Sequence, residues 1–384
     1  MAQAHTANAI TSGRRSTPPF RADHVGSLLR PKPLLDAREQ FAAGTISAEA
    51  LRAIEDDAIR DVVAMQRDVG LQSASDGEFR RASWHMDFIY QLGGIEKAPG
   101  DITVHFRNEQ GEIEFTPAAI HVAAAVHLEK PIFGEDFRFL QSLVDDDVTA
   151  KLTIPSPSMV HYRGGRAAID PDVYPDLDVF WRDLTGAYAA QVKAVADMGG
   201  RYLQFDDTSL AYLNDPQQRA EMAGKGEDAE HLHETYIRHI NEALADKPEG
   251  LTVTTHMCRG NFRSSWVAEG GYDFVAEALF GELGVDGFFL EYDDARSGGF
   301  EPLRFVPKDK LVVLGLVTTK RGAIESKDDL MRRIEEASQY VAVEQLCLSP
   351  QCGFSSTVEG NAVTFDEQVA KLELIVETAA EVWG

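Results

Sequence analysis

Short runs of β-forming residues alternate with long amphipathic segments along the chain after residue 19. The short runs predict strands at 22–26, 71–75, 150–154, 202–205, 251–255, 287–290, 311–316 and 345–348. The longer segments carry apolar residues at helical spacing and predict helices that include 48–68, 173–198, 217–245, 264–280, 327–341 and 364–382. Strands that alternate with helices in this way favour a (β/α)8 TIM barrel. The same alternation fits a doubly wound parallel sheet, which is the structural alternative.

The segment 100–145 follows a different pattern from the rest of the chain. It begins DITVHFRNEQGEIEF, where polar and apolar residues alternate with a period of two around a glycine. This pattern predicts a β-hairpin insertion in the loop after the second strand. Residues 1–19 predict a flexible tail, and residues 20–384 predict a single catalytic barrel that carries this insertion.

Composition narrows the class of protein. The chain has 37 basic and 62 acidic residues, and its net charge of −25 argues against nucleic acid as a partner. No apolar run reaches the ~18 residues of a membrane helix, so no membrane partner is expected. The N-terminus lacks the apolar core of a secretory signal, and three cysteines are too few for a disulfide framework, which predicts a cytoplasmic protein.

Polar residues gather where the predicted strands end. They stand in the motifs DHVGS, SDGEFRR, LQFDD, TTHMC, FFLEYDD and LSPQCG. The carboxyl ends of the strands of a barrel converge on one face, and active sites lie at that face. The gathering of chemically active residue types at these ends therefore predicts an enzyme.

Four of these residues are of the types that bind zinc, namely His256, Cys258, Glu291 and Cys352. His256 and Cys258 are two residues apart, so their side chains face the same way on an extended strand. The spacing alone is common by chance, and a core histidine with buried cysteines is the alternative. The coincidence of four such ligands at three strand ends favours a metal site.

Charged residues at the ends of strands two and four suggest substrate contacts. Glu78 and Asp206 could bind a substrate ammonium group, although acidic residues at such positions also cap helices. Arg80, Arg81 and Arg259 could bind a carboxylate or a sulfonate, or they pair with nearby acids.

With these residues in view, the chain resembles the catalytic C-terminal barrel of cobalamin-independent methionine synthase, from Asp23 to the C-terminal helix. The resemblance rests on THMC, on the glutamate of FFLEYDD, on SPQCG and on the Gln-Phe-Asp of LQFDD. It implies that Zn2+ is held by His256, Cys258, Glu291 and Cys352. It also implies that homocysteine is bound by Gly26, Ser27, Glu78 and Asp206.

The chain departs from that family on the side of the methyl donor. The family's Asp-Ile-His segment after strand seven corresponds to residues 318–320, and its folate-stacking tryptophan is replaced by His161. The extra N-terminal barrel of the two-barrel synthases has no counterpart in the 384 residues. By position alone, Lys320, with His161 or His24, is the expected acid for the leaving group.

These observations predict a zinc-dependent thiol alkyltransferase. The first expectation is transfer of a methyl group to homocysteine, which gives methionine, with methyltetrahydrofolate or another carrier as the donor. The alternative is an enzyme similar to the epoxyalkane:coenzyme M transferases, which alkylate a different thiol. A zinc-storing or thiol-sensing barrel is the non-enzymatic alternative, and the oligomeric state is left open.

Overall fold

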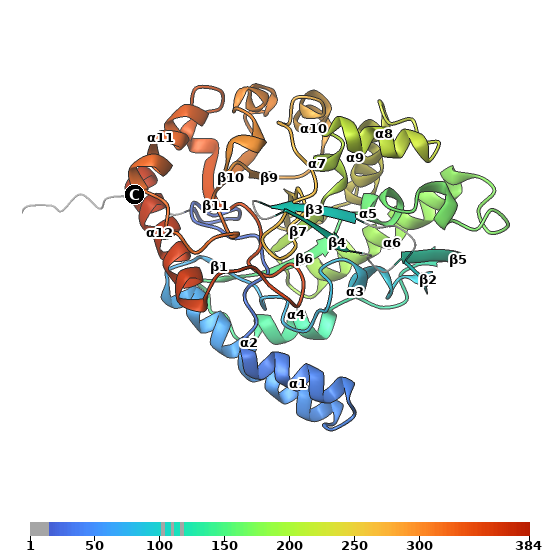
Figure 1. The fold of residues 1–384 in the computed structure, drawn as a ribbon, viewed down its shortest axis with the longest axis horizontal. Helices are drawn as coiled ribbons and strands as arrows, with labels where there is room; N and C mark the ends of the chain where they lie inside the picture. The colour runs from blue at the N-terminus through green and yellow to red at the C-terminus, as the bar shows by residue number, and fades with distance from the viewer. Residues whose placement is uncertain (1–14, 101–103, 109–110, 116–118) are drawn as a thin grey trace, which may run out of the picture.

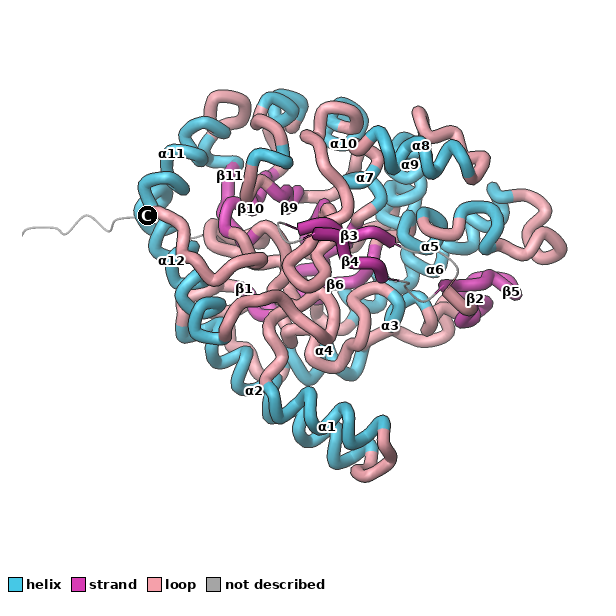
Figure 2. The backbone as a smooth tube through the Cα atoms, in the orientation of Figure 1, coloured by secondary structure: helices cyan, strands magenta, loops and turns pink. Residues whose placement is uncertain are grey.

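The computed structural model describes residues 15–100, 104–108, 111–115 and 119–384. Seven parallel strands form the central sheet, in the order in which they occur along the chain (Figure 1). They are β1 (Ser73–Ala74), β6 (Thr149–Pro155), β7 (Tyr202–Asp207), β8 (Thr252–Met257), β9 (Gly287–Glu291), β10 (Leu311–Val317) and β11 (Leu346–Pro350). Helices lie around the outside of the curled sheet (Figure 2). This sequential order confirms the barrel, because a doubly wound sheet reverses its strand order partway.

The segment predicted as the first strand lies between β11 and β1. Ala22 forms a parallel bridge with Leu348, and the amide of Asp23 donates to the Leu348 carbonyl at 3.0 Å. On the other side the amide of Leu28 donates to the carbonyl of Gly77 at 3.2 Å. These contacts bring the two edges of the sheet together.

The first segment is not a regular strand, because side chains bond to its backbone: the Gln204 amide group donates to the Val25 carbonyl at 2.6 Å, and the Lys151 ammonium donates to the His24 carbonyl. The Asp23 carboxylate accepts hydrogen bonds from the Phe20 amide, the Ser73 hydroxyl and the Tyr202 hydroxyl, at 3.0, 2.9 and 2.8 Å. The Lys151 ammonium lies 3.5 Å from the same carboxylate, and both side chains are fully buried. A buried ion pair with further hydrogen bonds therefore anchors this part of the barrel.

The α-helices differ from the predicted ones mainly at glycines. Predicted segment 217–245 is two helices, because the chain turns at Gly226, where φ is +89°. Predicted segment 264–280 is helical only in its last turns, since Ser264 and Gly270 have positive φ. The α-helices are α1 (Lys32–Ala42), α2 (Ala48–Asp68), α3 (Met86–Ile89), α4 (Gly134–Gln141), α5 (Ser158–Tyr162), α6 (Leu177–Asp197), α7 (Ser209–Tyr212), α8 (Pro216–Gly224), α9 (Leu232–Leu244), α10 (Ala276–Glu282), α11 (Lys327–Ala337) and α12 (Phe365–Trp383).

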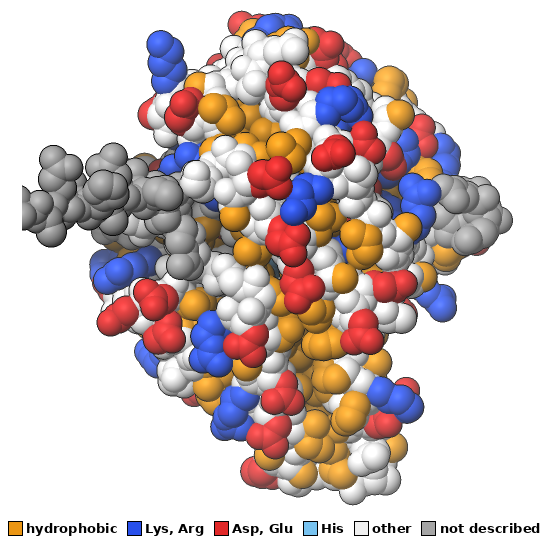
Figure 3. All heavy atoms as spheres, turned by 90° about the vertical axis from the view of Figure 1, so that its left-hand side faces the viewer, with side chains coloured by type: hydrophobic (Ala, Val, Ile, Leu, Met, Phe, Trp, Pro, Cys, Tyr) orange, Lys and Arg blue, Asp and Glu red, His pale blue; other side chains and the backbone are white. Residues whose placement is uncertain are grey.

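Four short 3₁₀ helices complete the described helical elements. They are η1 (Gly165–Ala168), η2 (Ala295–Ser297), η3 (Glu301–Phe305) and η4 (Val343–Gln345). None of the helices in the described part of the chain has the length and apolar composition that a bilayer crossing requires. On the face shown in Figure 3, acidic and basic side chains are interspersed, and hydrophobic side chains gather toward the bottom, over the projecting pair of α1 and α2.

The predicted insertion contains two antiparallel strand pairs. The strand β2 (Gly93–Ala98) pairs with β5 (Ala119–His127), and β3 (Val104–Asn108) pairs with β4 (Gly111–Phe115). The strands begin before residue 100, and the last part of the predicted segment holds α4 instead. The connecting residues 101–103, 109–110 and 116–118 lie outside the described residues. A bridge between Arg107 and Trp266 ties β3 to the loop after β8.

Removal of the cap of α12 is expected to cost about 1 kcal/mol of unfolding free energy. The Thr364 hydroxyl accepts from the Glu367 amide, and the Glu367 carboxylate accepts from the Thr364 amide. The variant Thr364→Ala loses this reciprocal pair, which urea denaturation measures. Ser326→Ala is the matched control, because Ser326 precedes α11 without a side-chain capping bond. Equal losses in the two variants would contradict the capping role.

Candidate metal centre and adjoining cavity

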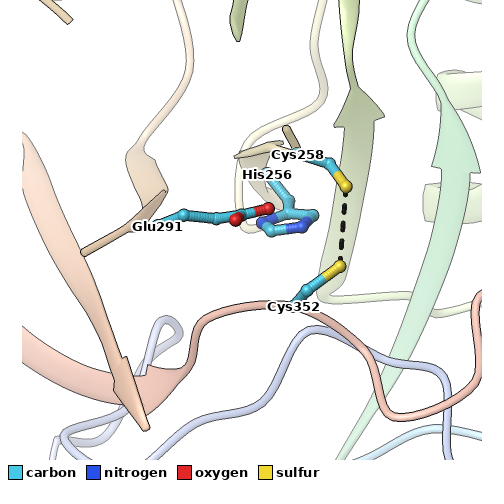
Figure 4. A group of neighbouring side chains, drawn as sticks. All are labelled: His256, Cys258, Glu291 and Cys352. Atoms are coloured by element: carbon cyan, nitrogen blue, oxygen red, sulfur yellow. Dashed lines mark hydrogen bonds between the residues drawn. The ribbon is translucent and has the colours of Figure 1, made fainter. Parts of the chain in front are cut away.

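Four side chains converge at the carboxyl ends of three strands. His256 belongs to the end of β8 and Cys258 follows it, Glu291 ends β9, and Cys352 lies just after β11. One ligand atom from each residue lies within 4.8 Å of those of the others, and all four residues are buried (Figure 4). The two sulfur atoms are 3.5 Å apart. The structure thus brings together the four residues that the sequence predicted as metal ligands.

The unsatisfied atoms of this cluster fit a metal ion. Neither ring nitrogen of His256 has a hydrogen-bond partner among the described residues, although both are buried. An orphaned buried polar atom is costly unless a ligand satisfies it. One imidazole, two thiols and one carboxylate form the donor set that Zn2+ prefers in proteins. The cluster therefore has the chemistry of a zinc site.

Glu291 is held from two sides. Its Oε1 accepts a hydrogen bond from the Arg259 amide at 2.9 Å, and the Lys320 ammonium lies 3.9 Å from Oε2. Burial raises the pKa of Glu291 to about 7, although the nearby Lys320 ammonium favours the ionised form. A divalent cation beside this carboxylate would hold it ionised.

A cavity of about 300 Å³ opens from this cluster, and we call it the metal-site cavity. At its inner end are His256, Cys258 and Cys352. Its remaining wall combines polar groups with aromatic and aliphatic side chains, namely Val25, Ser27, Glu78, Ala82, Ser83, Trp84, His85, Met86, Asp87, Tyr90, Phe106, Arg163, Asp206, Thr208, Tyr212, Gly260, Asn261, Phe262, Ser356, Thr357, Val358 and Glu359.

Two carboxylates face this cavity near the metal cluster. Glu78 accepts from the Thr153 hydroxyl at 2.7 Å through Oε1, while its buried Oε2 has no partner among the described residues. Asp206 accepts from the Gln204 amide group at 2.6 Å. Burial, followed by the charge of Glu78, raises the pKa of Asp206 to about 7. A bound cation would relieve the repulsion between the two carboxylates, and a substrate ammonium group has the required charge and donors.

Gly26 and Ser27 lie beside these acids. Gly26 has a φ of +137°, and a Cβ at this position would stand 2.6 Å from the Thr153 methyl group and 3.6 Å from the Glu78 carboxylate. Only glycine fits there without displacing the neighbours of Glu78. Ser27 contributes to the cavity wall. All four residues predicted to bind the thiol substrate therefore lie together.

The three residues predicted as proton donors do not line the metal-site cavity. His161 is packed against Trp181, with Nδ1 at 3.0 Å from the Tyr236 hydroxyl. Burial lowers the pKa of both His161 and His24 to about 4, so neither ring is a protonated imidazolium acid at neutral pH. The Lys320 ammonium is engaged by Asp293 at 3.2 Å, beside Glu291. The structure therefore gives the predicted acid role no support, and Lys320 takes the position of a partner for Glu291.

None of the three arginines predicted to bind a sulfonate lines the metal-site cavity. Arg80 is paired with Asp56. Arg81 lies over the Phe133 ring, and its Nη1 lies 3.6 Å from Oε1 of Glu78 and donates to the Thr153 hydroxyl at 3.1 Å. The Arg259 guanidinium donates to the Arg296 carbonyl and does not belong to the cavity wall. Arg81 therefore offsets part of the charge of Glu78, and none of these three arginines lines the metal-site cavity.

The aromatic side chains of the cavity wall, and Arg163, were not predicted from the sequence. Trp84, Phe106 and Phe262 come from three separate segments, and Phe106 lies on β3 of the insertion. The Phe106 and Phe262 ring centroids are 5.2 Å apart. The sequence did contain one indication of Phe106: it is the apolar residue between His105 and Arg107 in a segment where polar and apolar residues alternate. Such a residue on an inserted strand marks the side that packs against the protein.

Truncation of this wall is expected to weaken substrate binding modestly. An aromatic pair contributes about 0.5–1.5 kcal/mol beyond buried area, so Phe106→Ala should raise a substrate KM about 2- to 12-fold with unchanged zinc content. Steady-state kinetics and elemental analysis of the same sample measure both. Phe41→Ala, on the exposed side of α1, is the control. Unchanged KM values for every substrate would show that Phe106 covers the cavity without contacting a substrate.

Known proteins and one family model are similar to this chain along nearly its whole length. The family model for the catalytic domain of cobalamin-independent synthases matches residues 21–381. The uncharacterized protein YxjG of Bacillus subtilis is 48% identical over 385 residues, which cover 100% of both chains. A solved structure from Listeria monocytogenes, described as a "Putative Vitamin-B12 Independent Methionine Synthase", is 40% identical with a TM-score of 0.76 and covers 96% of this chain and 99% of that one.

A more distant structure shares the fold. It is a B12-independent methionine synthase from a Shewanella species, in complex with selenomethionine. It is 19% identical with a TM-score of 0.69, and the match covers 94% of this chain and 97% of that one.

Proposed function

Because the chain belongs to the cobalamin-independent methionine synthase family, whose members are methyltransferases, we propose that it is a zinc-dependent thiol alkyltransferase that methylates homocysteine to methionine. One observation carries the proposal. The donor set of His256, Cys258, Glu291 and Cys352 opens onto the same cavity as the unpaired carboxylate oxygen of Glu78. A small amino acid that carries a thiol could therefore place its sulfur at the metal and its ammonium group at these acids.

The four ligand residues are proposed to hold Zn2+. When bound, Zn2+ supplies Lewis-acid chemistry, because it lowers the pKa of a thiol substrate enough to make the sulfur a nucleophile at neutral pH. The side chains of the protein then orient the acceptor. Glu78 and Asp206 bind the ammonium group, and the segment of Gly26 and Ser27 receives the carboxylate. The buried walls of the cavity exclude water from the reacting atoms.

The same contacts favour an amino-acid thiol over a sulfonate thiol such as coenzyme M. A sulfonate near Glu78 and Asp206 would meet two carboxylates. Arg80 and Arg259 are engaged away from the cavity, and Arg81 is already paired with Glu78 and does not line the cavity. Like charges brought together in a buried site are strongly disfavoured. Homocysteine is therefore the proposed acceptor, and methyltetrahydrofolate is the first donor to test. The predicted cytoplasmic location remains a prediction.

The test compares two acceptors with one simple electrophile. Zinc-loaded protein is supplied with methyl iodide and with either homocysteine or coenzyme M, and the methylated products are quantified. Methyl iodide needs neither a donor site nor a proton donor, so the assay isolates activation of the thiol. The proposal expects protein-dependent methylation of homocysteine and little of coenzyme M. Preference for coenzyme M would favour the alternative transferase, and zinc without acceleration of either thiol would favour the zinc-storing barrel.

A further inference from the structure

The side chain of Arg163 lies where three cavities meet. Arg163 directly follows α5 and contributes to the wall of the metal-site cavity. It also lines a cavity of about 490 Å³, which we call the side cavity, and a smaller one of about 80 Å³. His85 and Met86 are shared between the metal-site cavity and the side cavity. The metal-site cavity and the side cavity therefore adjoin at His85, Met86 and Arg163.

No partner for the Arg163 guanidinium is found among the described residues. It makes no ion pair and donates no side-chain hydrogen bond within the described part of the chain, and its Nε is buried. This is notable in a protein with a net charge of −25, in which carboxylates are abundant. A half-buried guanidinium with unsatisfied donors is suited to a planar, bidentate anion such as a carboxylate. Glu78 pairs with Arg81 at 3.6 Å and accepts from Thr153, and Asp206 accepts from Gln204.

The side cavity has an apolar wall. It is formed by α3, by the strand pair β2 and β5, and by the segment from α5 to η1. Ile89, Ala119, Ile120 and Val160 are among its lining residues. Lys225 stands at its edge and donates to the Arg163 carbonyl at 2.7 Å. The volume and lining are those of a binding site for the apolar body of a small molecule.

We propose that Arg163 determines donor specificity: it binds an anionic group of the alkyl donor, and the part of the donor that does not react extends into the side cavity. This inference rests on the proposed function, because it assigns the second substrate of the same site. The amino-acid acceptor occupies the acidic end of the metal-site cavity, so the bulk of the donor requires other space. The side cavity is such a space, and Arg163 lies at its border with the metal-site cavity.

The test measures binding of a matched pair of donors by calorimetry, with homocysteine present. The pair is 5-methyltetrahydrofolate, a dicarboxylate, and its uncharged dimethyl ester. Arg163→Gln should weaken binding of the acid about 10- to 100-fold and leave binding of the ester unchanged, since only the acid loses a charge-assisted contact. Arg182→Gln is the control, because Arg182 is a 71% exposed arginine on α6. Ala119→Phe should weaken both ligands by filling the side cavity.

The outcomes separate this inference from the proposed function. Equal weakening of acid and ester by Arg163→Gln, or no change in either, would overturn the role of Arg163. Weakened binding of homocysteine in that variant would assign the guanidinium to the acceptor and would also overturn it. A wild-type protein that binds neither probe but accelerates the methyl iodide reaction would overturn the donor assignment and leave the proposed function standing. Failure of the methyl iodide reaction itself would remove the proposed function.

Discussion

Replacement of Cys352 by serine is expected to remove the metal and the activity together. A serine hydroxyl is a poor zinc ligand, and Cys352 supplies one of only two sulfur atoms in the cluster. Loss of a residue that merely orients a ligand already costs about 10- to 100-fold in metal affinity or activity, so loss of a ligand should cost more. We expect a decrease of at least about 1000-fold in homocysteine methylation at limiting zinc. Elemental analysis and the methylation assay measure the two quantities on one sample.

Cys347 provides the matched control for this experiment. It is a fully buried cysteine of β11 whose neighbours are Phe20, Val313 and Tyr202 in a separate apolar cluster. Cys347→Ala also removes a thiol but should keep one zinc per chain and near-normal activity. A Cys352→Ser protein that retained full zinc content and activity would contradict the ligand assignment.

The second large effect concerns the acceptor. The double variant Glu78→Gln with Asp206→Asn should keep zinc but raise the KM for homocysteine about 100-fold or more. Each carboxylate bond to an ammonium group is worth about 1.5–3 kcal/mol, because both partners are charged. The two amides preserve size and some hydrogen bonding but remove both charges. The rate with homocysteine and methyl iodide, measured over a range of homocysteine concentrations, gives KM and kcat separately.

A surface pair controls for the change in net charge. Glu39→Gln with Asp61→Asn removes the same two charges from exposed positions on α1 and α2. Its KM should match that of the wild type. A fall in kcat without a rise in KM in the double variant of Glu78 and Asp206 would show that these acids act in the reaction step and not in acceptor binding.

The sequence allowed prediction of the cluster because barrel geometry places strand ends side by side. His256, Glu291 and Cys352 are far apart in the chain, yet each closes or follows a strand of the sheet. Once the alternation of strands and helices indicates a barrel, such residues must converge at one face. The irregular form of the predicted first strand could not be predicted in this way. It depends on the buried contacts of Asp23 with Lys151 and Tyr202, which no local sequence pattern reveals.

The donor side of the cavity was beyond sequence reasoning for a different reason. Its wall is assembled from loops and from an inserted strand pair, whose positions follow from tertiary packing and not from periodicity. His161 illustrates the problem, since its place after the third barrel strand suggested a contact with the donor. The structure turns its ring toward Trp181 and Tyr236, while Arg163, two residues later, faces the cavity.

The central claim is that the cluster holds zinc and presents it to the thiol of homocysteine. X-ray absorption at the zinc edge, on protein with one zinc per chain, tests it most directly. The prediction is two sulfur ligands in the protein alone, from Cys258 and Cys352, and one additional sulfur after homocysteine is added. A zinc spectrum with two sulfur ligands that does not change with saturating homocysteine would contradict the claim.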